Sequence, residues 1–155
     1  MKLFKLKKEL YERLIKDAEF ERDACRPYYI IRGLDYKGKK ISIGIPLRSN
    51  INKKFNSKKD EFVATLPTDH TLISNGNIAG WHITKIIPID YSLVVAYKID
   101  QNPSLSISFE IANHYFHKDL MEKTKGMLKR FENGENVFGA IDFDWAIEII
   151  EKMKE

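Results

Sequence analysis

The sequence has only one cysteine, no long apolar run and no glycine-rich nucleotide-binding motif. The single cysteine, Cys25, excludes an internal disulfide, as is usual for cytoplasmic proteins. The longest apolar runs are far shorter than the roughly 20 residues that a membrane-spanning helix needs. Lysines interrupt the apolar residues near the N-terminus, which therefore lacks the continuous apolar segment of a signal peptide. These absences predict a cytoplasmic protein that does not cross a membrane.

The motifs of several enzyme classes are also missing. The sequence has no phosphate-binding P-loop, no dinucleotide glycine fingerprint and no nucleophile elbow. His114 and His117 are three residues apart, a spacing that can share a helix face. However, no cysteine or carboxylate stands at ligand spacing beside them. The sequence therefore predicts neither a metal site nor a cofactor.

What the sequence does contain is typical of a globular protein with an uneven charge distribution. Its 155 residues, 43% hydrophobic and 31% charged, predict a single domain over residues 1–155. The net charge is only +4, but residues 37–59 contain eight lysines or arginines and no acid. Residues 135–155, in contrast, contain six acids and two lysines. A positive run of this length suits phosphate, although a solvated loop is the other reading of such a run.

Hydrophobic periodicity predicts mostly short strands. We expect strands over residues 1–6, 28–36, 41–45, 62–66, 81–88 and 91–99. Lys37-Gly38-Lys39 is predicted to form a hairpin turn between the second and third of them. Pro46 has no N–H, so regular pairing should end there or the residue should lie at a sheet edge. Asn50 to Lys59 is polar and basic and is expected to form a flexible loop. Alternation in the strand over residues 81–88 would place His82, Thr84 and Ile86 on one face.

Apolar residues at helical spacing predict about three helices. Two should cover residues 7–22 and 117–131, the second ending at Asn133-Gly134. Asp142 or Asp144 should cap a last helix, whose apolar stripe should belong to the core. Together these elements predict an α+β fold, with a compact curled antiparallel sheet or small SH3-like barrel decorated by helices.

The candidate chemistry lies where the third strand ends. There Arg48 and Ser49 place a guanidinium beside a hydroxyl, with Lys53 following and with Arg26 and Tyr28 expected across the sheet. RNA carries its own nucleophile, the 2′-hydroxyl, so its cleavage needs positioning, proton transfer and cations on the phosphorane, but no metal. Serine is a poor base at neutral pH, so Ser49 would hold a phosphate oxygen or orient the 2′-hydroxyl.

Two further assignments complete the predicted site. His82 has a suitable unperturbed pKa for proton transfer, although a histidine bonded inside the core is an equally good reading. The basic run supplies the predicted RNA-binding residues, which are Lys37, Lys39, Lys40, Lys53, Lys54, Lys58 and Lys59.

Several segments together resemble the RNA-cleaving toxins of type III toxin–antitoxin systems, the ToxN/AbiQ family with its CptN and TenpN relatives. Residues 1–15 are similar to the opening strand and helix of that family, and residues 26–31 resemble the start of its first long strand. Residues 44–49, Gly-Ile-Pro-Leu-Arg-Ser, resemble its Pro-Leu-Thr-Ser strand end. Residues 85–89, Lys-Ile-Ile-Pro-Ile, resemble a later Met-Ile-Pro-Ile/Val strand. The resemblance covers most of the chain.

The resemblance implies a fold, an activity and a partner. The fold would be a barrel-like core related to MazF and Kid, and the activity metal-independent RNA cleavage that leaves a cyclic phosphate. The partner would be a small repeated pseudoknot RNA that inhibits the toxin and is processed by it, in a cyclic hetero-oligomeric protein–RNA assembly in the bacterial cytoplasm. Ser49 matches the family serine, Arg48 stands where the family has threonine, and Arg26 stands near a family lysine. Lys53 would replace a lysine two residues past the serine if the loop is longer here.

Two other functions remain open from the sequence. The second hypothesis, after the endoribonuclease toxin, is an RNA-binding module without catalytic activity that uses the basic hairpin over residues 37–59. The hairpin can also belong to an interaction domain whose lysines only keep it in solution.

Overall fold

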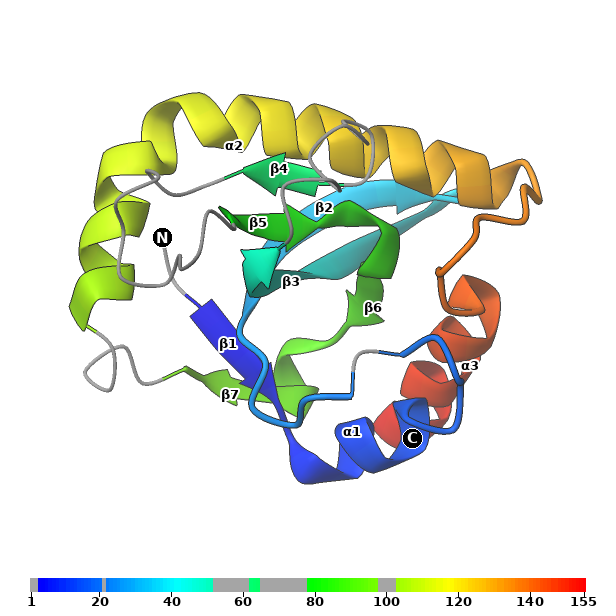
Figure 1. Ribbon diagram of the computed structural model, residues 1–155. Coiled ribbons are helices and arrows are strands. Elements are labelled where there is room, and N and C mark those ends of the chain that lie inside the picture. Colours follow the sequence, from blue (N-terminus) through cyan, green and yellow to red (C-terminus); the bar gives the residue numbers. More distant parts are fainter. Residues whose placement is uncertain (1–2, 21, 52–61, 65–77, 98–102) are drawn as a thin grey trace.

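A long β-hairpin forms the centre of the structure, a computed structural model that describes residues 3–20, 22–51, 62–64, 78–97 and 103–155 (Figure 1). Strand β2 (Tyr28–Tyr36) pairs antiparallel with β3 (Lys39–Ile51), in a register from Tyr28↔Pro46 to Tyr36↔Lys39. Lys37 and Gly38 form the turn with φ angles of 47° and 77°, and two positive φ angles are the signature of a type I′ hairpin turn. The predicted strand over 28–36 and its turn are confirmed.

An irregularity in β2 bends this hairpin. The register shifts between Ile31 and Leu34, and Gly33 has a φ of 68° inside the shift. An extra residue in one strand of an antiparallel pair increases the local twist, and glycine accepts the positive φ without a Cβ penalty. The sheet therefore curls around its long hairpin.

Seven strands pair in the described part of the chain, in the order β4-β5-β3-β2-β1-β7, with β6 also paired to β3. The other five strands are short: β1 (Leu3–Leu6), β4 (Phe62–Ala64), β5 (Ile78–His82), β6 (Ile87–Ile89) and β7 (Val94–Ala96). The sheet is antiparallel and curled but does not close into a barrel, so of the two expected forms it takes the curled sheet. The α+β class is confirmed.

β5 and β6 lie end to end along β3 but are not one strand. β5 pairs with the Leu47–Ile51 half of β3 and β6 with its Ser42–Gly44 segment. Between them the 3₁₀ turn η2 (Ile83–Lys85) leaves the sheet opposite Pro46. Leu47 donates its N–H to the Pro27 carbonyl on the β2 side, and N–H directions alternate along a strand, so the missing N–H of Pro46 faces the β5/β6 side.

The break at η2 corrects the expectation of one continuous strand over residues 81–88. His82, Thr84 and Ile86 do not share one face of a strand, because a turn intervenes, and all three are buried. Pairing with β2 ends at Pro46, as expected, but β3 itself continues to Ile51 by pairing with β5.

Three α-helices surround the sheet, with different lengths from those predicted. α1 (Lys8–Leu14) is shorter than the expected 7–22, since the Asp17 carboxylate accepts from the Glu19 N–H and favours a turn. α2 (Pro103–Glu132) is longer than the expected 117–131. Pro103 is its first residue, the position of a helix at which proline needs no N–H partner.

The ends of α2 and α3 (Phe143–Lys154) agree with the prediction. Gly134, with a φ of 72°, terminates α2, and Glu135 donates its N–H to the Arg130 carbonyl at 3.0 Å, a pattern typical of a glycine helix end. The Asp142 carboxylate caps α3 by accepting from the Trp145 N–H at 3.1 Å. No described helix has the length and apolar character needed to span a membrane.

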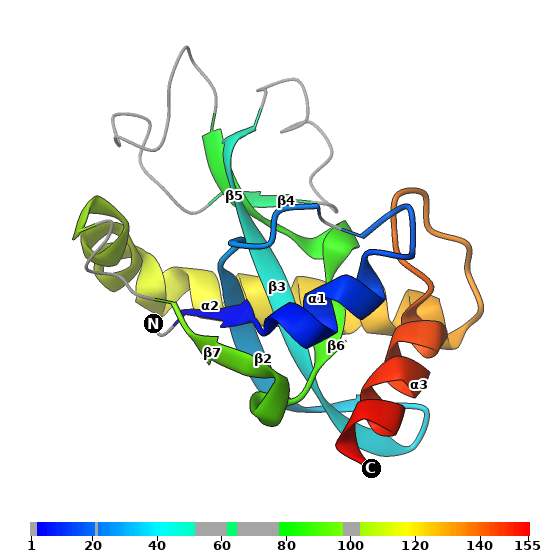
Figure 2. The same ribbon diagram turned by 90° about the horizontal axis from the view of Figure 1, so that it is seen from below.

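The helices cover two core clusters. α2 lies along one side of the hairpin, and α1 and α3 lie together near β6 (Figures 1 and 2). One cluster includes Ile43, Trp81 and Leu120, and the other includes Leu10, Tyr28 and Ile150. β3 contributes to the first cluster and pairs with β2, β5 and β6. Core packing and strand pairing therefore hold the Leu47–Ile51 end of β3 in position.

We predict opposite effects on stability for two glycines. A Cβ at Gly44 would lie 3.0 Å from Ile89 Cδ1 and 3.3 Å from Tyr28 Cδ1. Gly44→Val should therefore lower the free energy of unfolding by about 1–3 kcal/mol through overpacking. A Cβ at Gly126 in α2 would meet nothing within 4 Å, so Gly126→Ala should raise it by about 0.5–1 kcal/mol. Urea unfolding measures both, and a Gly44→Val protein as stable as the wild type would contradict the close packing at β3.

Candidate active site

The site begins where β2 and β3 stop pairing. Arg26 precedes β2 and donates from Nη1 to the Leu47 carbonyl at 3.1 Å, beside the bond from the Leu47 N–H to the Pro27 carbonyl at 3.0 Å. Arg48 follows Leu47 in β3 and is paired with Gly80 of β5. The structure thus brings Arg26 next to the Leu47-Arg48 segment, as the sequence analysis expected.

His82 joins these two arginines from the neighbouring strand. It is the last residue of β5, and its side chain is only 6% exposed. Burial and, to a lesser degree, the positive charges of Arg48, Lys85 and Arg26 together lower its pKa from the usual 6.5 to about 3. The imidazole is therefore neutral over the physiological range of pH, and three cations surround it.

Lys85 is a member of this group that the sequence analysis did not assign to the site. His82 is the residue before η2 and Lys85 is its last residue, and residues three apart on a 3₁₀ turn lie on the same side. The spacing could have indicated the pair only if the turn had been predicted in place of a strand. We call Arg26, Arg48, His82 and Lys85 the cationic cluster.

Acidic residues of the segment between α1 and β2 hold two of the cations. Lys85 donates to the Glu19 carbonyl at 2.5 Å and lies 3.4 Å from its carboxylate. Arg26 lies 3.5 Å from the Asp23 carboxylate. Both basic side chains are less than one fifth exposed, so their positions are well restrained. These contacts reduce the cost of gathering like charges around His82.

The other predicted catalytic residues are placed differently. Tyr28 is 1% exposed and its ring packs against Gly44 in the core, so its catalytic role stays a prediction. Ser49 follows Arg48 inside β3, which continues to Ile51, so its backbone belongs to the strand and does not lie at a strand end as predicted. Lys53 lies outside the described residues, as do the predicted RNA-binding residues Lys54, Lys58 and Lys59. The roles of these residues also stay predictions.

The remaining lysines of the basic run lie far from the cationic cluster. Lys37, Lys39 and Lys40 are at the opposite end of the hairpin, near the C-terminus (Figure 2). At about 3.3 Å per residue, Lys39 and Arg48 are separated by about 30 Å of strand. Lys37 Nζ is 2.9 Å from Asp144, and Lys40 Nζ is 2.6 Å from Asp35. The folded strand therefore divides a run that is continuous in sequence.

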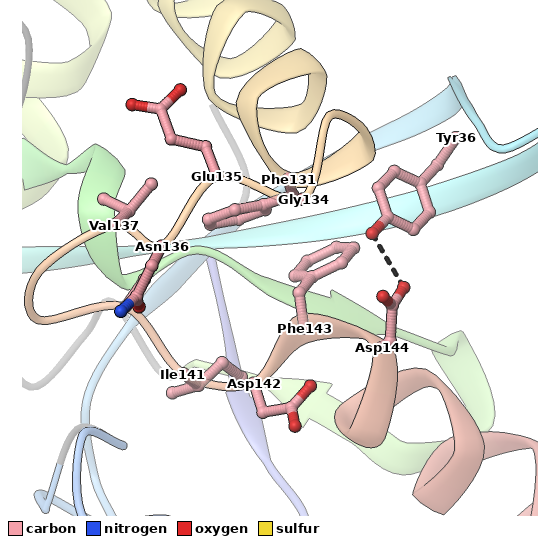
Figure 3. A pocket seen from close by; sticks show the side chains of 11 residues that line it. Tyr36, Phe131, Gly134, Glu135, Asn136, Val137, Ile141, Asp142, Phe143 and Asp144 are labelled. Atoms are coloured by element: carbon pink, nitrogen blue, oxygen red, sulfur yellow. Dashed lines mark hydrogen bonds between the residues drawn. The ribbon is translucent and has the colours of Figure 1, made fainter.

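The hairpin turn is attached to α3. The Tyr36 hydroxyl donates to Asp144 Oδ1 at 2.7 Å, and burial together with this carboxylate raises the pKa of Tyr36 (Figure 3). A cavity of about 390 Å³ lies beside this bond, but Glu135, Asp142 and Asp144 are among its lining residues. Because carboxylates repel phosphate, this cavity is a poor site for RNA, and the cationic cluster is the better candidate.

Comparison with known proteins relates the fold to one class of toxins. The sequence matches no protein-family profile and no curated protein. Three solved structures are similar over nearly the full length. AbiQ, a lactococcal anti-phage endoribonuclease of a type III toxin–antitoxin system, has a TM-score of 0.72 and 14% identity, over 99% of this chain and 98% of its own. The fold is that of the ToxN/AbiQ toxins.

The other two structures belong to the same group. One comes from a bacterial type III system with selective toxin inhibition by a non-coding RNA pseudoknot, at a TM-score of 0.63 and 18% identity, over 99% of this chain and 98% of its own. The second comes from a bacterial antiviral system regulated by a processed non-coding RNA, at a TM-score of 0.68 and 16% identity, over 96% of each chain. At these identities the similarity concerns the fold, so the function has to be argued from the site.

We predict that His82 makes stability depend on pH in a defined window. From about pH 6.5 down to 3 the unfolded chain binds a proton at His82 that the folded protein does not, so protons favour unfolding. As the pH falls through that window, the titration of His82 should lower the free energy of unfolding by up to about 1.4 kcal/mol per pH unit. Above pH 6.5, His82 should make no contribution to the pH dependence of that free energy. Urea unfolding of the wild type and of His82→Asn, which cannot titrate, measures the difference.

Ring chemical shifts provide the control for this prediction. In the free protein the His82 resonances should show no titration near pH 6.5. A transition near that pH, or equal pH dependence of the two proteins, would contradict the buried position of His82 among cations.

Proposed function

We propose that this protein is the endoribonuclease toxin of a bacterial type III toxin–antitoxin system and acts in the cytoplasm without a metal. In this proposal, a small repeated pseudoknot RNA inhibits the toxin, is processed by it and forms a cyclic hetero-oligomeric assembly with it. One observation carries the proposal. A cluster of three cations around a buried neutral histidine lies at the end of β3, in a chain that has the fold of RNA-regulated toxins over nearly its full length.

The reaction follows from the chemistry of RNA. The 2′-oxygen attacks the adjacent phosphorus and loses its proton to a base, while the bond from phosphorus to the 5′-oxygen breaks and that oxygen gains a proton. The products are a 2′,3′-cyclic phosphate and a 5′-hydroxyl. Arg26, Arg48 and Lys85 are suited to stabilise the charge that develops on the phosphorane oxygens. Ser49 would hold a phosphate oxygen or orient the 2′-hydroxyl.

His82 is suited to the proton transfer once RNA is bound. The free protein holds its pKa near 3, partly through the charges of Arg48, Lys85 and Arg26. A phosphate placed among these cations would offset their field, so the pKa of His82 would rise toward the reaction pH, where a base is most effective. The same anion that is to be cleaved would thus activate the base.

We expect RNA cleavage that continues in EDTA. The purified protein, incubated with labelled single-stranded RNA and EDTA, should give products with 2′,3′-cyclic phosphate and 5′-hydroxyl ends, because the nucleophile belongs to the substrate. Mass spectrometry identifies these ends. Products with 5′-phosphate ends, or strict dependence on magnesium, would refute the mechanism. Binding without cleavage would favour the non-catalytic RNA-binding module.

We also expect cleavage and binding to be separable by substitution. Ser49→Ala should nearly abolish cleavage. RNA binding by this variant should depend on salt concentration in the same way as binding by the wild type. Replacing Lys53, Lys54, Lys58 and Lys59 by alanine should make RNA binding less dependent on salt. For single strands, each phosphate contact contributes about −0.7 to the slope of the logarithm of the binding constant against the logarithm of the salt concentration. Salt titrations with labelled RNA measure both variants.

A matched control comes from the opposite end of the hairpin. Lys39→Ala with Lys40→Ala changes two lysines that lie about 30 Å of strand away from Arg48, so cleavage of a short RNA should be retained. If the four-lysine variant keeps the wild-type slope, the RNA-binding surface lies elsewhere.

A further inference from the structure

One aromatic side chain stands out among the described residues. Phe138 is 93% exposed, and the only other large hydrophobic residue counted as exposed there is Val95, at 38%. Phe138 lies in the segment that connects α2 to α3, which passes beside the turn between β5 and β6 (Figure 1, orange). A fully exposed phenylalanine buries no apolar surface on folding, so its ring is accessible to a ligand.

The backbone holds Phe138 in place. Ala140 donates its N–H to the Val137 carbonyl at 3.2 Å, and Gly139 has a φ of 82°. A positive φ at the third position is the signature of a type II turn, which places Phe138 at its second position. Val137 and Ile141, on either side, are 9% and 5% exposed and belong to the two core clusters. The ring is therefore presented by a turn that is anchored at both ends.

This turn lies against η2, the segment that connects His82 to Lys85 of the cationic cluster. A Cβ at Gly139 would be 3.9 Å from Cγ2 of Thr84. Thr84 is the middle residue of η2, with His82 before the turn and Lys85 at its end. The segment is also tied to the chain that carries Glu19, since Asp142 donates its N–H to the Asp17 carboxylate at 2.8 Å. Phe138 thus directly precedes Gly139, the residue that lies against Thr84 of η2, and η2 ends at Lys85.

The surroundings of Phe138 indicate what it binds. Its neighbours Glu135 and Asn136 are exposed and polar, and Val95 is the only other exposed large hydrophobic residue in the part of the chain that the structure describes. Among those residues the ring does not belong to an apolar patch of the size that a protein partner covers. A single exposed ring suits one other planar ring. Nucleobases stack on aromatic side chains, and every base has a face that can do so.

We propose that Phe138 is a stacking platform for one RNA base that flanks the nucleotide whose phosphate lies in the cationic cluster. The subsite rests on the proposed function, since it needs an RNA strand at that cluster. It gives the site a contact with a base in addition to its contacts with phosphate. The base on Phe138 then fixes the register of the strand relative to His82 and Lys85.

A double-mutant cycle tests this subsite. The probes are short labelled single-stranded RNAs that span a position cleaved by the wild type, each lacking one base at a successive position. Phe138→Ala should weaken binding of the complete RNA about 5- to 150-fold, the range for loss of one base–aromatic stack. One RNA without a base should bind the wild type equally weakly and should lose nothing further with Phe138→Ala. Phe138→Trp should bind as the wild type does, and Val95→Ala is the matched exposed control.

The outcomes separate this proposal from the one on which it rests. If the wild type cleaves RNA but Phe138→Ala binds as well as the wild type, the subsite alone is overturned. The subsite is also overturned if Phe138→Ala weakens the binding of every RNA in the series by the same factor. If the wild type neither binds nor cleaves single-stranded RNA, the proposed function falls and the subsite with it. Circular dichroism of Phe138→Ala should match the wild type, because the side chain has almost no packing contacts to lose.

Discussion

The missing N–H of Pro46 is the constraint around which the site is built. It leaves one position on the β5/β6 side of β3 without a donor, and there the neighbouring chain turns out of the sheet as η2. The turn brings Lys85 round to His82, and the same stretch of β3 offers the Leu47 carbonyl to Arg26. If the chain paired continuously here, His82, Thr84 and Ile86 would lie on one face of a strand. Lys85 would then lie on the opposite face, away from His82.

Like charges can gather at this point because their surroundings compensate for them. Glu19 and Asp23 lie on the segment between α1 and β2, and each contacts one cation of the cluster. The charge that remains acts on His82, which burial already keeps neutral. An arrangement of this kind has its lowest energy when an anion joins it, so the free protein is prepared for phosphate rather than for a cation or an apolar ligand.

The sequence was a good guide where a local pattern decides the structure. The hairpin turn at Lys37-Gly38, the strand Tyr28–Tyr36 and the Asp142 cap all depend on neighbouring residues. It was a poor guide where a distant partner or a competing local bond decides. The length of α1 depends on a side-chain bond of Asp17, and η2 depends on a proline almost forty residues earlier in the chain.

The same distinction applies to the site. Arg26, Arg48 and His82 were predicted from their chemistry and lie near one another in the structure, whereas Lys85 was not predicted because its place depends on η2. Phe138 gave no sequence signal, since apolar residues at its position normally belong to the core. Its exposure becomes visible only in the structure, where Val137 and Ile141 on either side of it are buried.

The order of charges along the sequence does not show how these charges are distributed in the folded protein. Lys37 and Lys40 at the hairpin turn are paired with Asp144 and Asp35, and α3 adds further acids at the same end. The cations of the cluster lie toward the other end of β3, where Arg26 contacts Leu47 and Arg48 is paired with Gly80 of β5. Under the proposed function, this distribution of the described charges would draw a polyanion to one end of the long strand rather than along its whole length. Within the described residues, that end is also the one where a buried histidine and an anchored aromatic ring lie on neighbouring segments.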